Sequence, residues 1–350
     1  ALCTSNLPDV AVTPSEHFSV VTRAGTGSNA AITGVGFSPS LVWSKSRTDG
    51  NGHTLTDAVR GVSVRLTSDG TNADISGDAH GLVSFDSDGY TVESGTAING
   101  SSRNYVDWNW KANGSGSSNT DGSITSTVSA NVDAGFSIVS YTGTGSNATI
   151  GHGLSKAPEM WAVKPRTDVS DNQWFVCHTG LASDYATDFI HFDTNGAKQD
   201  NALMWNDTPP TSSVINLGSK PGTNNSGGSF ICYAWHSVDG YSKVGSYLGN
   251  GVADGTFVCT GFRPAFILLK QSTAAQDWQI YDVKRSTTNL IDDALYPNSS
   301  AAETTANYLD MDIVSNGFKV RAVSGANNVN NGIYIYLAFA ETPFKYSNAR

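Results

Sequence analysis

The chain contains the stretch Gly25-Thr26-Gly27-Ser28-Asn29-Ala30 twice, because Gly143-Thr144-Gly145-Ser146-Asn147-Ala148 repeats it letter for letter. A looser third copy, Gly249-Asn250-Gly251, opens the last third of the chain. Each copy is followed by a proline and an apolar run that ends in lysine. Repeats near a hundred residues are domain-sized, and longer than the roughly 20–50 residues of solenoid or propeller units. The sequence therefore predicts three copies of one unit.

Each unit ends in an aromatic strand, at residues 105–110, 230–235 and 334–339. These landmarks divide the chain into six predicted segments. They are an N-terminal connector at 1–16, a first unit at 17–113, a flexible Gly/Ser/Asn-rich linker at 114–134, a second unit at 135–238, a third unit at 239–345 and a tail at 346–350.

The 350 residues have a formal net charge of −10, and only 15% of them are charged. Binding to a phosphate backbone requires clustered Lys and Arg, which the sequence lacks, so we expect no nucleic-acid partner. A transmembrane helix needs about 18 or more consecutive apolar residues, and no run approaches that length. We therefore expect no membrane span.

Apolar and aromatic residues fall in runs of four to eight, bounded by Gly, Asn, Asp and Pro, which is typical of strands. Asp88-Gly89 and Asn316-Gly317 are strong hairpin signals. The pattern predicts an all-β protein in which each unit is an antiparallel, lectin-like β-sandwich of two packed sheets.

Several strings resemble a domain family of unknown function that recurs in large virion or tail-fibre-like proteins of marine bacteriophages, cyanophages among them. The strings lie at residues 2–8, 119–131, 205–214, 261–266 and 339–345. In that family the domain often follows a SPRY-like, concanavalin-type sandwich. The resemblance implies a component of a phage particle, and it transfers no catalytic residue.

The sequence offers little for catalysis. Glycoside hydrolysis needs two carboxylates about 5–10 Å apart, and the five glutamates lack the strand spacing typical of sandwich-fold glucanases. The seven histidines are scattered singly, and no Gly-x-Ser-x-Gly motif lies between a strand and a helix. We therefore expect a protein that is not an enzyme, with a polysaccharide hydrolase as the least favoured alternative.

Few residues suggest a cofactor or a disulfide. Asp86 and Asp88 offer oxygen ligands that calcium prefers, although Asp is also common in hairpin turns for its hydrogen bonds. Calcium is thus the one possible cofactor, and no other metal is expected.

Cys177 and Cys232 lie in strands of one unit, where each is either a small buried side chain or one half of a bridge.

The eight tryptophans are more informative. Trp43 matches Trp161 in the repeat, and the positions of Trp110, Trp235 and Phe339 also match, which indicates core positions. The candidate ligand-binding residues are those outside this pattern: Trp205 with its neighbours Asn206 and Asp207, and Trp174 and Trp278. Exposed indole rings commonly hold sugar faces while Asn and Asp bind the hydroxyls. The alternative for Trp205 is a loop anchor packed on its own unit.

Charged residues also repeat among the units. Lys45, Lys164 and Lys270 share one position, and Asp57/Arg60 matches Asp282/Arg285. We interpret these as fold-stabilising salt bridges or solvated strand edges.

These observations predict a non-enzymatic virion protein of the fibre type, on the particle surface, that attaches to a host cell-surface polysaccharide. The alternative is a decoration or scaffold module that contacts other virion proteins and has no affinity for glycans. In either case we expect a homo-oligomer, with a trimer as the usual form.

Overall fold

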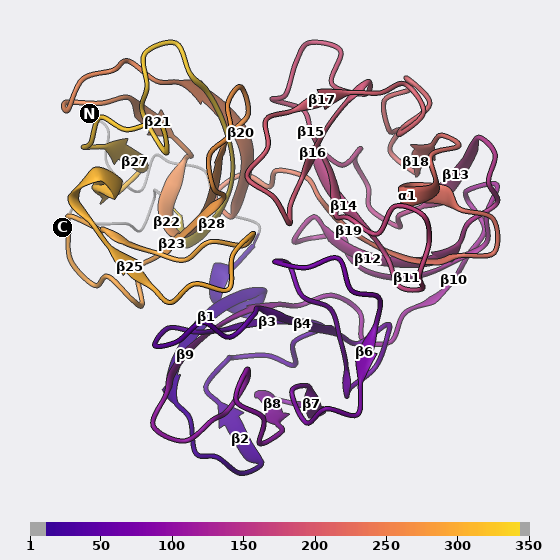
Figure 1. The fold of residues 1–350 in the computed structure, drawn as a ribbon, viewed down its shortest axis with the longest axis horizontal. Helices are drawn as coiled ribbons and strands as arrows, with labels where there is room; N and C mark the ends of the chain where they lie inside the picture. Colours follow the sequence, from indigo (N-terminus) through magenta and orange to yellow (C-terminus); the bar gives the residue numbers. More distant parts are fainter. Residues whose placement is uncertain (1–11, 344–350) are drawn as a thin grey trace.

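The computed structural model describes residues 12–343 and is built from β-strands and short helical turns. Strands make up 42% of the structure and helices 3%, and the named strands all pair antiparallel. The predicted all-β class is confirmed. Figure 1 shows three lobes around a common centre, which we call the first (12–113), second (114–238) and third (239–343) lobes. None of the described helices has the length and apolar character needed to cross a bilayer.

Each lobe contributes a sheet with the same strand order to the centre of the molecule. The order is an edge strand, the aromatic strand, the strand that ends in or near the shared lysine, and its hairpin partner. The strands are β1 (Phe18–Ala24), β9 (Asn104–Trp110), β3 (Leu41–Ser46) and β4 (Thr54–Asp57); β12 (Phe136–Thr142), β19 (Ser229–Trp235), β14 (Met160–Pro165) and β15 (Phe175–His178); β20 (Ser242–Leu248), β28 (Ile333–Pro343), β22 (Phe262–Gln271) and β23 (Gln279–Asp282).

The pairing register repeats as well. Trp110 lies between Phe18 and Leu41, Trp235 between Phe136 and Met160, and Phe339 between Ser242 and Phe266. All three aromatic side chains are buried in the shared core. The predicted equivalence of Trp110, Trp235 and Phe339 is confirmed.

The predicted equivalence of Trp43 and Trp161 is wrong by one residue. Trp43 lies opposite Trp108 and faces the shared core, and the matching position in the second lobe is Ala162, opposite Tyr233. Trp161 packs into the second lobe's own outer core. Side chains alternate between the two faces of a strand, so a shift of one residue exchanges the faces.

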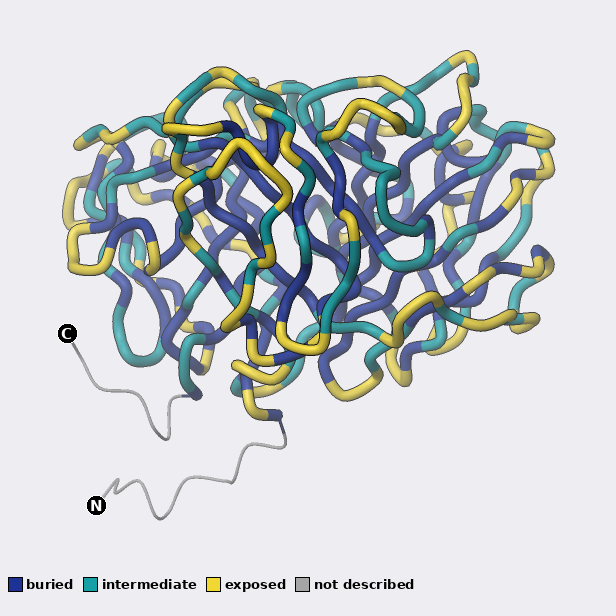
Figure 2. The backbone as a smooth tube through the Cα atoms, turned by 90° about the horizontal axis from the view of Figure 1, so that it is seen from below, coloured by how far each residue is buried: buried dark blue, intermediate teal, exposed yellow. Residues whose placement is uncertain are grey.

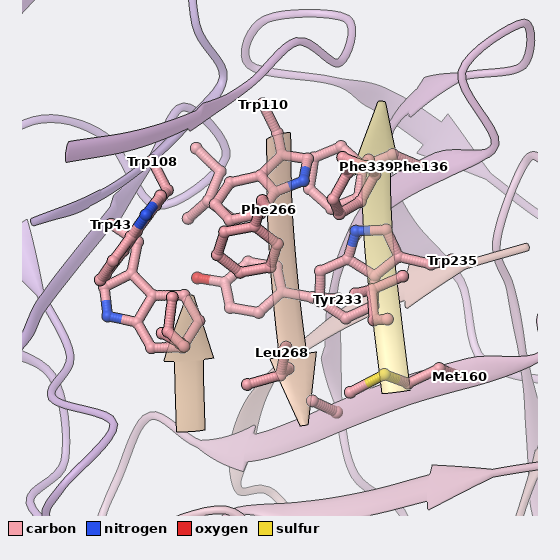
Figure 3. Close-up of a cluster of buried hydrophobic side chains, with 14 of the residues drawn as sticks. Trp43, Trp108, Trp110, Phe136, Met160, Tyr233, Trp235, Phe266, Leu268 and Phe339 are labelled. Carbon is pink, nitrogen blue, oxygen red and sulfur yellow. The ribbon is translucent and has the colours of Figure 1, made fainter. Parts of the chain in front are cut away.

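One apolar core lies between the three sheets and takes side chains from every lobe (Figure 3). Trp43 and Trp108 come from the first lobe, Tyr233 and Trp235 from the second and Phe266 from the third. A gap of about 20 Å³ remains at its centre, which is room for about one water molecule. The centre of the molecule is therefore a packed core and not a binding cavity.

A smaller sheet covers the outer face of each central sheet and encloses a further apolar cluster. These outer sheets are β2 (Ala30–Thr33), β8 (Gly89–Val92) and β7 (Leu82–Asp86); β13 (Ala148–Gly151) and β18 (Val214–Leu217); β21 (Phe257–Cys259), β27 (Gly317–Val320) and β26 (Met311–Val314). The inner strands β3 and β14 are accordingly buried along their whole length. Figure 2 shows exposed residues mainly on the loops at the two rims.

The remaining elements are short. They are η2 (Pro14–Glu16), β5 (Val64–Arg65), β6 (Ile75–Ser76), β10 (Ser117–Asn119), β11 (Ser126–Asn131), β16 (Asp188–His191), β17 (Gln199–Asp200), α1 (Pro221–Asn224), β24 (Asp293–Ala294), β25 (Thr304–Thr305) and η3 (Asn307–Leu309).

The segment 114–134 is not the flexible linker that its composition predicts. It forms β10 and β11, and β11 pairs with the edge of β12, so the central sheet of the second lobe has eight strands. Gly116 has a φ of +78°, and a Cβ there would lie 2.7 Å from the carbonyl oxygen of Val128. This glycine permits a close approach of two strands and does not mark a flexible joint.

The possible disulfide is not formed. Cys177 and Cys232 are free and buried on β15 and β19, which lie on opposite sides of β14. Cys259, the last residue of β21, is also free and is exposed. Cys3 lies outside the described residues, as do most of the predicted connector and all of the predicted tail.

Candidate functional site

The three tryptophans predicted to hold a sugar are all buried. Trp174, Trp205 and Trp278 expose at most 1% of their surface. The indole of Trp205 packs edge-on against Trp161 and donates its N–H to the carbonyl oxygen of Asp188 at 3.1 Å. No sugar ring can reach these faces, so the predicted aromatic platform is wrong and the loop-anchor alternative holds for Trp205.

Trp174 and Trp278 join neighbouring lobes. The indole N–H of Trp174, in the second lobe, donates to the carbonyl oxygen of Thr67 in the first lobe at 2.8 Å. The indole N–H of Trp278, in the third lobe, donates to the carbonyl oxygen of His191 in the second lobe at 2.8 Å. Trp174 and Trp278, which share one position in the repeat, thus both pack against a neighbouring lobe.

His53 takes this position in the first lobe. Its Nδ1 accepts the indole N–H of Trp43 at 2.8 Å, so its Nε2 carries the proton and donates to the carbonyl oxygen of Tyr296 in the third lobe at 3.0 Å. Burial lowers the pKa of His53 well below its ordinary value, which keeps the ring neutral. The three hydrogen bonds run from second lobe to first, first to third and third to second, and close a ring.

The shared lysines are buried and bind backbone carbonyls. Lys164 Nζ donates across the lobe boundary to the carbonyl oxygen of Thr71 at 3.1 Å, and Lys270 Nζ donates to that of Asn195 at 3.2 Å. Lys45 has the same burial and binds carbonyls of its own lobe. Burial lowers the pKa of each amine to about 8. The expected salt bridge or solvated edge is wrong for these residues, because carbonyl oxygens hold the ammonium groups.

The predicted salt bridges do form at the Asp–Arg positions. Asp57 and Arg60 lie 2.5 Å apart, and Asp282 and Arg285 lie 2.6 Å apart, with fully buried side chains. The hydroxyl of Tyr233, in the second lobe, donates to the Asp57 carboxylate of the first lobe at 2.7 Å. These pairs are part of the lobe boundaries, which supports the fold-stabilising interpretation.

Asn206 and Asp207 are exposed, unlike Trp205 beside them. Both adopt left-handed backbone conformations, with φ of 57° and 45°. The amide of Asn147, from the second copy of the repeated stretch, donates to the side-chain oxygen of Asn206 at 2.5 Å. What remains of the predicted site is a polar surface formed by these residues.

Three asparagines that the sequence interpretation overlooked hold the repeated stretches in place. The buried side chain of Asn224 accepts the backbone N–H of Thr144 at 2.8 Å and donates to the carbonyl oxygen of Ser146 at 2.6 Å. Asn99 and Asn328 make the same contacts in the other lobes. Each asparagine lies 11 residues before the last core aromatic of its lobe, a spacing that identifies it in the sequence.

The two calcium candidates have structural hydrogen bonds. The Asp86 carboxylate accepts the hydroxyls of Ser84 at 2.7 Å and Thr91 at 3.0 Å. The Asp88 carboxylate accepts backbone N–H groups of the 34–36 turn at 3.1 and 2.7 Å. Within residues 12–343, no three acidic, His or Cys side chains are grouped in a way that could hold a metal ion. Turn formation accounts for both residues.

Two grooves lie at lobe boundaries, each beside an edge strand. The groove beside β20 has a volume of about 540 Å³ and the groove beside β1 about 170 Å³. The first is lined by Gly180, Leu181, Ala182, Ser246, Tyr247, Leu248, Thr256 and Ile333. At the equivalent edge of the second lobe, β12 is covered by β11. The edge strand of the second lobe is therefore covered, whereas a groove lies beside the edge strand of each of the other two lobes.

Residues 13–343 match a protein family described as a domain of unknown function, DUF7483. The chain belongs to this family. The match spans all three lobes of this DUF7483 chain, so the family unit includes the shared core and the contacts between lobes. None of the curated proteins matches the chain.

Proposed function

We propose that the chain is a non-enzymatic structural protein of a bacteriophage particle, of the fibre or tail-fibre type, that decorates or scaffolds the particle surface. The observation that carries the proposal is the single core shared by three lobes and closed by the hydrogen bonds of Trp174, Trp278 and His53. Such packing joins the three lobes of residues 12–343 into one body, which suits a load-bearing or decorating module. The resemblance to phage virion proteins supports the setting.

The glutamates support a structural role. Glu303 forms ion pairs with Arg47 at 2.6 Å and with Arg285 at 2.9 Å, and so joins the first and third lobes. Glu159 accepts the backbone N–H of Ser237 at 2.5 Å. These carboxylates hold segments of the chain together, which is a structural use of an acidic side chain.

The proposal includes the arrangement of the chain in the particle. We take the lobes to be lectin-like sandwiches and the chain to be a homo-oligomer, with a trimer as the expected form. Leu248, Val252 and Phe257 of the third lobe expose 60%, 52% and 46% of their surface. Exposed apolar side chains of this size favour a contact with another protein.

Host attachment through a cell-surface polysaccharide is the second candidate. The exposed side chains of Asn147, Asn206 and Asp207 favour it, because amides and carboxylates bind sugar hydroxyls. Without an exposed indole beside them, such a site depends on hydrogen bonds alone. We therefore rank attachment below the scaffold role.

Immunogold labelling of purified particles of the source phage tests the main proposal. We expect antibodies against the purified chain to label the particle exterior. Particles without the chain would contradict the proposal.

A screen of glycans and host envelopes, with calcium and with EDTA, separates the alternatives. The scaffold role predicts no saturable binding and no new reducing ends. Saturable binding that is lost in the Asn206→Ala/Asp207→Ala variant would favour attachment. The control is Asn29→Ala, which removes an exposed amide from the first copy of the repeated stretch and leaves Asn147, Asn206 and Asp207 in place. New reducing ends would contradict the non-enzymatic assignment.

A further inference from the structure

The edge strands β1, β12 and β20 are equivalent. Thr22, Ser140 and Ser246 occupy matching register positions opposite the aromatic strands. Gly249, the residue after β20, donates its N–H to the carbonyl oxygen of Gly332, the residue before β28, at 2.9 Å. Because backbone groups alternate along a strand, the N–H and C=O groups of Ser246 and its two equivalents point away from the aromatic strand.

The second lobe shows what occupies such an edge. Ser140 of β12 pairs with Thr127 of β11, and Ile138 pairs with Ser129. The sequence of β11, from Ser126 to Asn131, is Ser-Thr-Val-Ser-Ala-Asn and carries no charge. A short, uncharged strand of small and β-branched residues therefore fits this type of edge.

Within residues 12–343, the connection that precedes β20 is too short to supply such a strand. From Trp110 to Phe136 there are 26 residues, which include β10 and β11, whereas from Trp235 to Ser242 there are 7. A connection of 7 residues has no room for a turn and a further strand of six residues. β20 is accordingly the outermost strand of its sheet, and the 540 Å³ groove lies beside it.

At the middle of β20 the outward backbone groups of Ser246 have no hydrogen-bond partner among the described residues, while Gly180 of the second lobe lies against the Ser246 side chain. Ser237 Oγ accepts the backbone N–H of Val244 at 3.0 Å, and Thr256 Oγ1 donates to the carbonyl oxygen of Leu248 at 2.8 Å. Ser246 lies between these two contacts and is exposed. An edge of this kind binds extended peptides by adding a strand.

We propose that the groove beside β20 binds an extended, uncharged Ser/Thr/Val-rich strand of another polypeptide, which pairs antiparallel with Ser246. The residues that line the groove carry no charge, and Leu248 and Phe257 beside it are exposed apolar side chains. The groove beside β1 is smaller and includes Lys284 and Glu341, so it does not match this chemistry. The inference rests on the proposed scaffold role, because that role identifies the source of the strand as another protein of the particle.

A peptide of residues 125–132, blocked at both ends, serves as the probe because it contains β11. We expect saturable binding to the purified chain, measured by fluorescence anisotropy up to about 1 mM peptide. In hydrogen exchange by NMR, bound peptide should slow the amide of Ser246 by about tenfold or more. The amides of Gly245 and Tyr247 should not change, because they already face β28.

Two variants test the geometry. Ser246→Pro removes the edge N–H, and we expect it to weaken binding about tenfold, since one lost hydrogen bond is worth about that factor. The matched control Ser246→Ala keeps the backbone donor and should bind within about twofold of wild type. Leu248→Lys places a charge beside the groove without changing the backbone, so it still tests the site if the proline variant does not fold.

No saturable binding to the wild-type chain would overturn the inference. Equal binding by wild type and a folded Ser246→Pro variant would do so too, as would equal binding of a peptide with Ser129→Pro. Self-association that Ser246→Pro abolishes would assign the edge to a second copy and overturn the partner named here. All of these measurements use purified chain, so their failure is distinct from a failure of particle labelling.

Discussion

Acid should destabilise the chain through His178, a buried residue at the boundary between the second and third lobes. Its Nδ1 accepts the backbone N–H of Gly180 at 2.8 Å, so its Nε2 carries the proton and donates to the carbonyl oxygen of Tyr336 at 3.1 Å. A second proton on Nδ1 would point at the N–H group of Gly180, at a buried position without access to water. Burial lowers the pKa of His178 from 6.5 to about 4, and the charge of Glu159 offsets only part of this effect.

The magnitude follows from proton linkage. The unfolded chain binds the proton near pH 6.5, before the folded chain does, so stability is present above pH 6.5 and is lost as the pH falls to about 4. Each pH unit in that window is worth about 1.4 kcal/mol. The loss from His178 is therefore about 2 kcal/mol by pH 5 and about 3 kcal/mol by pH 4.

Urea unfolding at pH 7.5 and pH 5.0 measures the stability that is lost through protonation of His178. When the pH falls from 7.5 to 5.0, the free energy of unfolding of His178→Gln should decrease by about 2 kcal/mol less than that of wild type. The reason is that Gln keeps a donor and an acceptor but does not titrate. His80→Gln is the control: His80 is only partly buried, and burial lowers its pKa while the charge of Asp78 offsets part of that effect. If His178→Gln loses as much stability as wild type, the assignment of the acid sensitivity to this residue is wrong.

Four further outcomes are expected. Trp205→Ala should cost about 3–5 kcal/mol in urea unfolding, and an unchanged melting temperature would contradict its burial. The pKa of Lys270 is about 8 in the folded chain and 10.5 in the unfolded chain. As the pH rises from 8 to 10, wild type should therefore lose stability relative to Lys270→Met, because the unfolded chain holds the proton that the folded chain releases. Parallel plots of unfolding free energy against pH for the two proteins would contradict this. Asn224→Ala should cost about 1–3 kcal/mol and speed amide exchange at Thr144. EDTA should leave the melting temperature unchanged, because Asp88 already binds the 34–36 turn.

The repeat in the sequence predicted the strand content and the positions of Trp110, Trp235 and Phe339, because strand period and pairing register follow from local pattern. The burial of Trp174 and Trp278 could not be predicted in this way. Their partners belong to a neighbouring lobe more than 80 residues away. Local sequence describes the loop around such a residue but does not describe the surface that packs against it.

The repeat contains enough information to predict that three asparagines occupy equivalent positions, although the sequence analysis does not identify them. Asn99, Asn224 and Asn328 lie at one spacing from the core aromatics, but their neighbours differ in each lobe. A polar residue that recurs without its neighbours is easily assigned to a turn. The structure shows that such a residue can have a full set of buried hydrogen bonds, which buried amides require.

Composition alone also misled the interpretation of residues 114–134. A Gly/Ser/Asn tract is flexible when nothing pairs with it, but here the open edge of β12 lies within reach and accepts β11. The difference between the two connections, 26 residues after Trp110 and 7 after Trp235, decides which edges the chain can cover by itself. An edge strand that stays unpaired is a liability unless something covers it. The short connection leaves β20 as the outermost described strand of its sheet, and our proposal is that a strand of another polypeptide covers it.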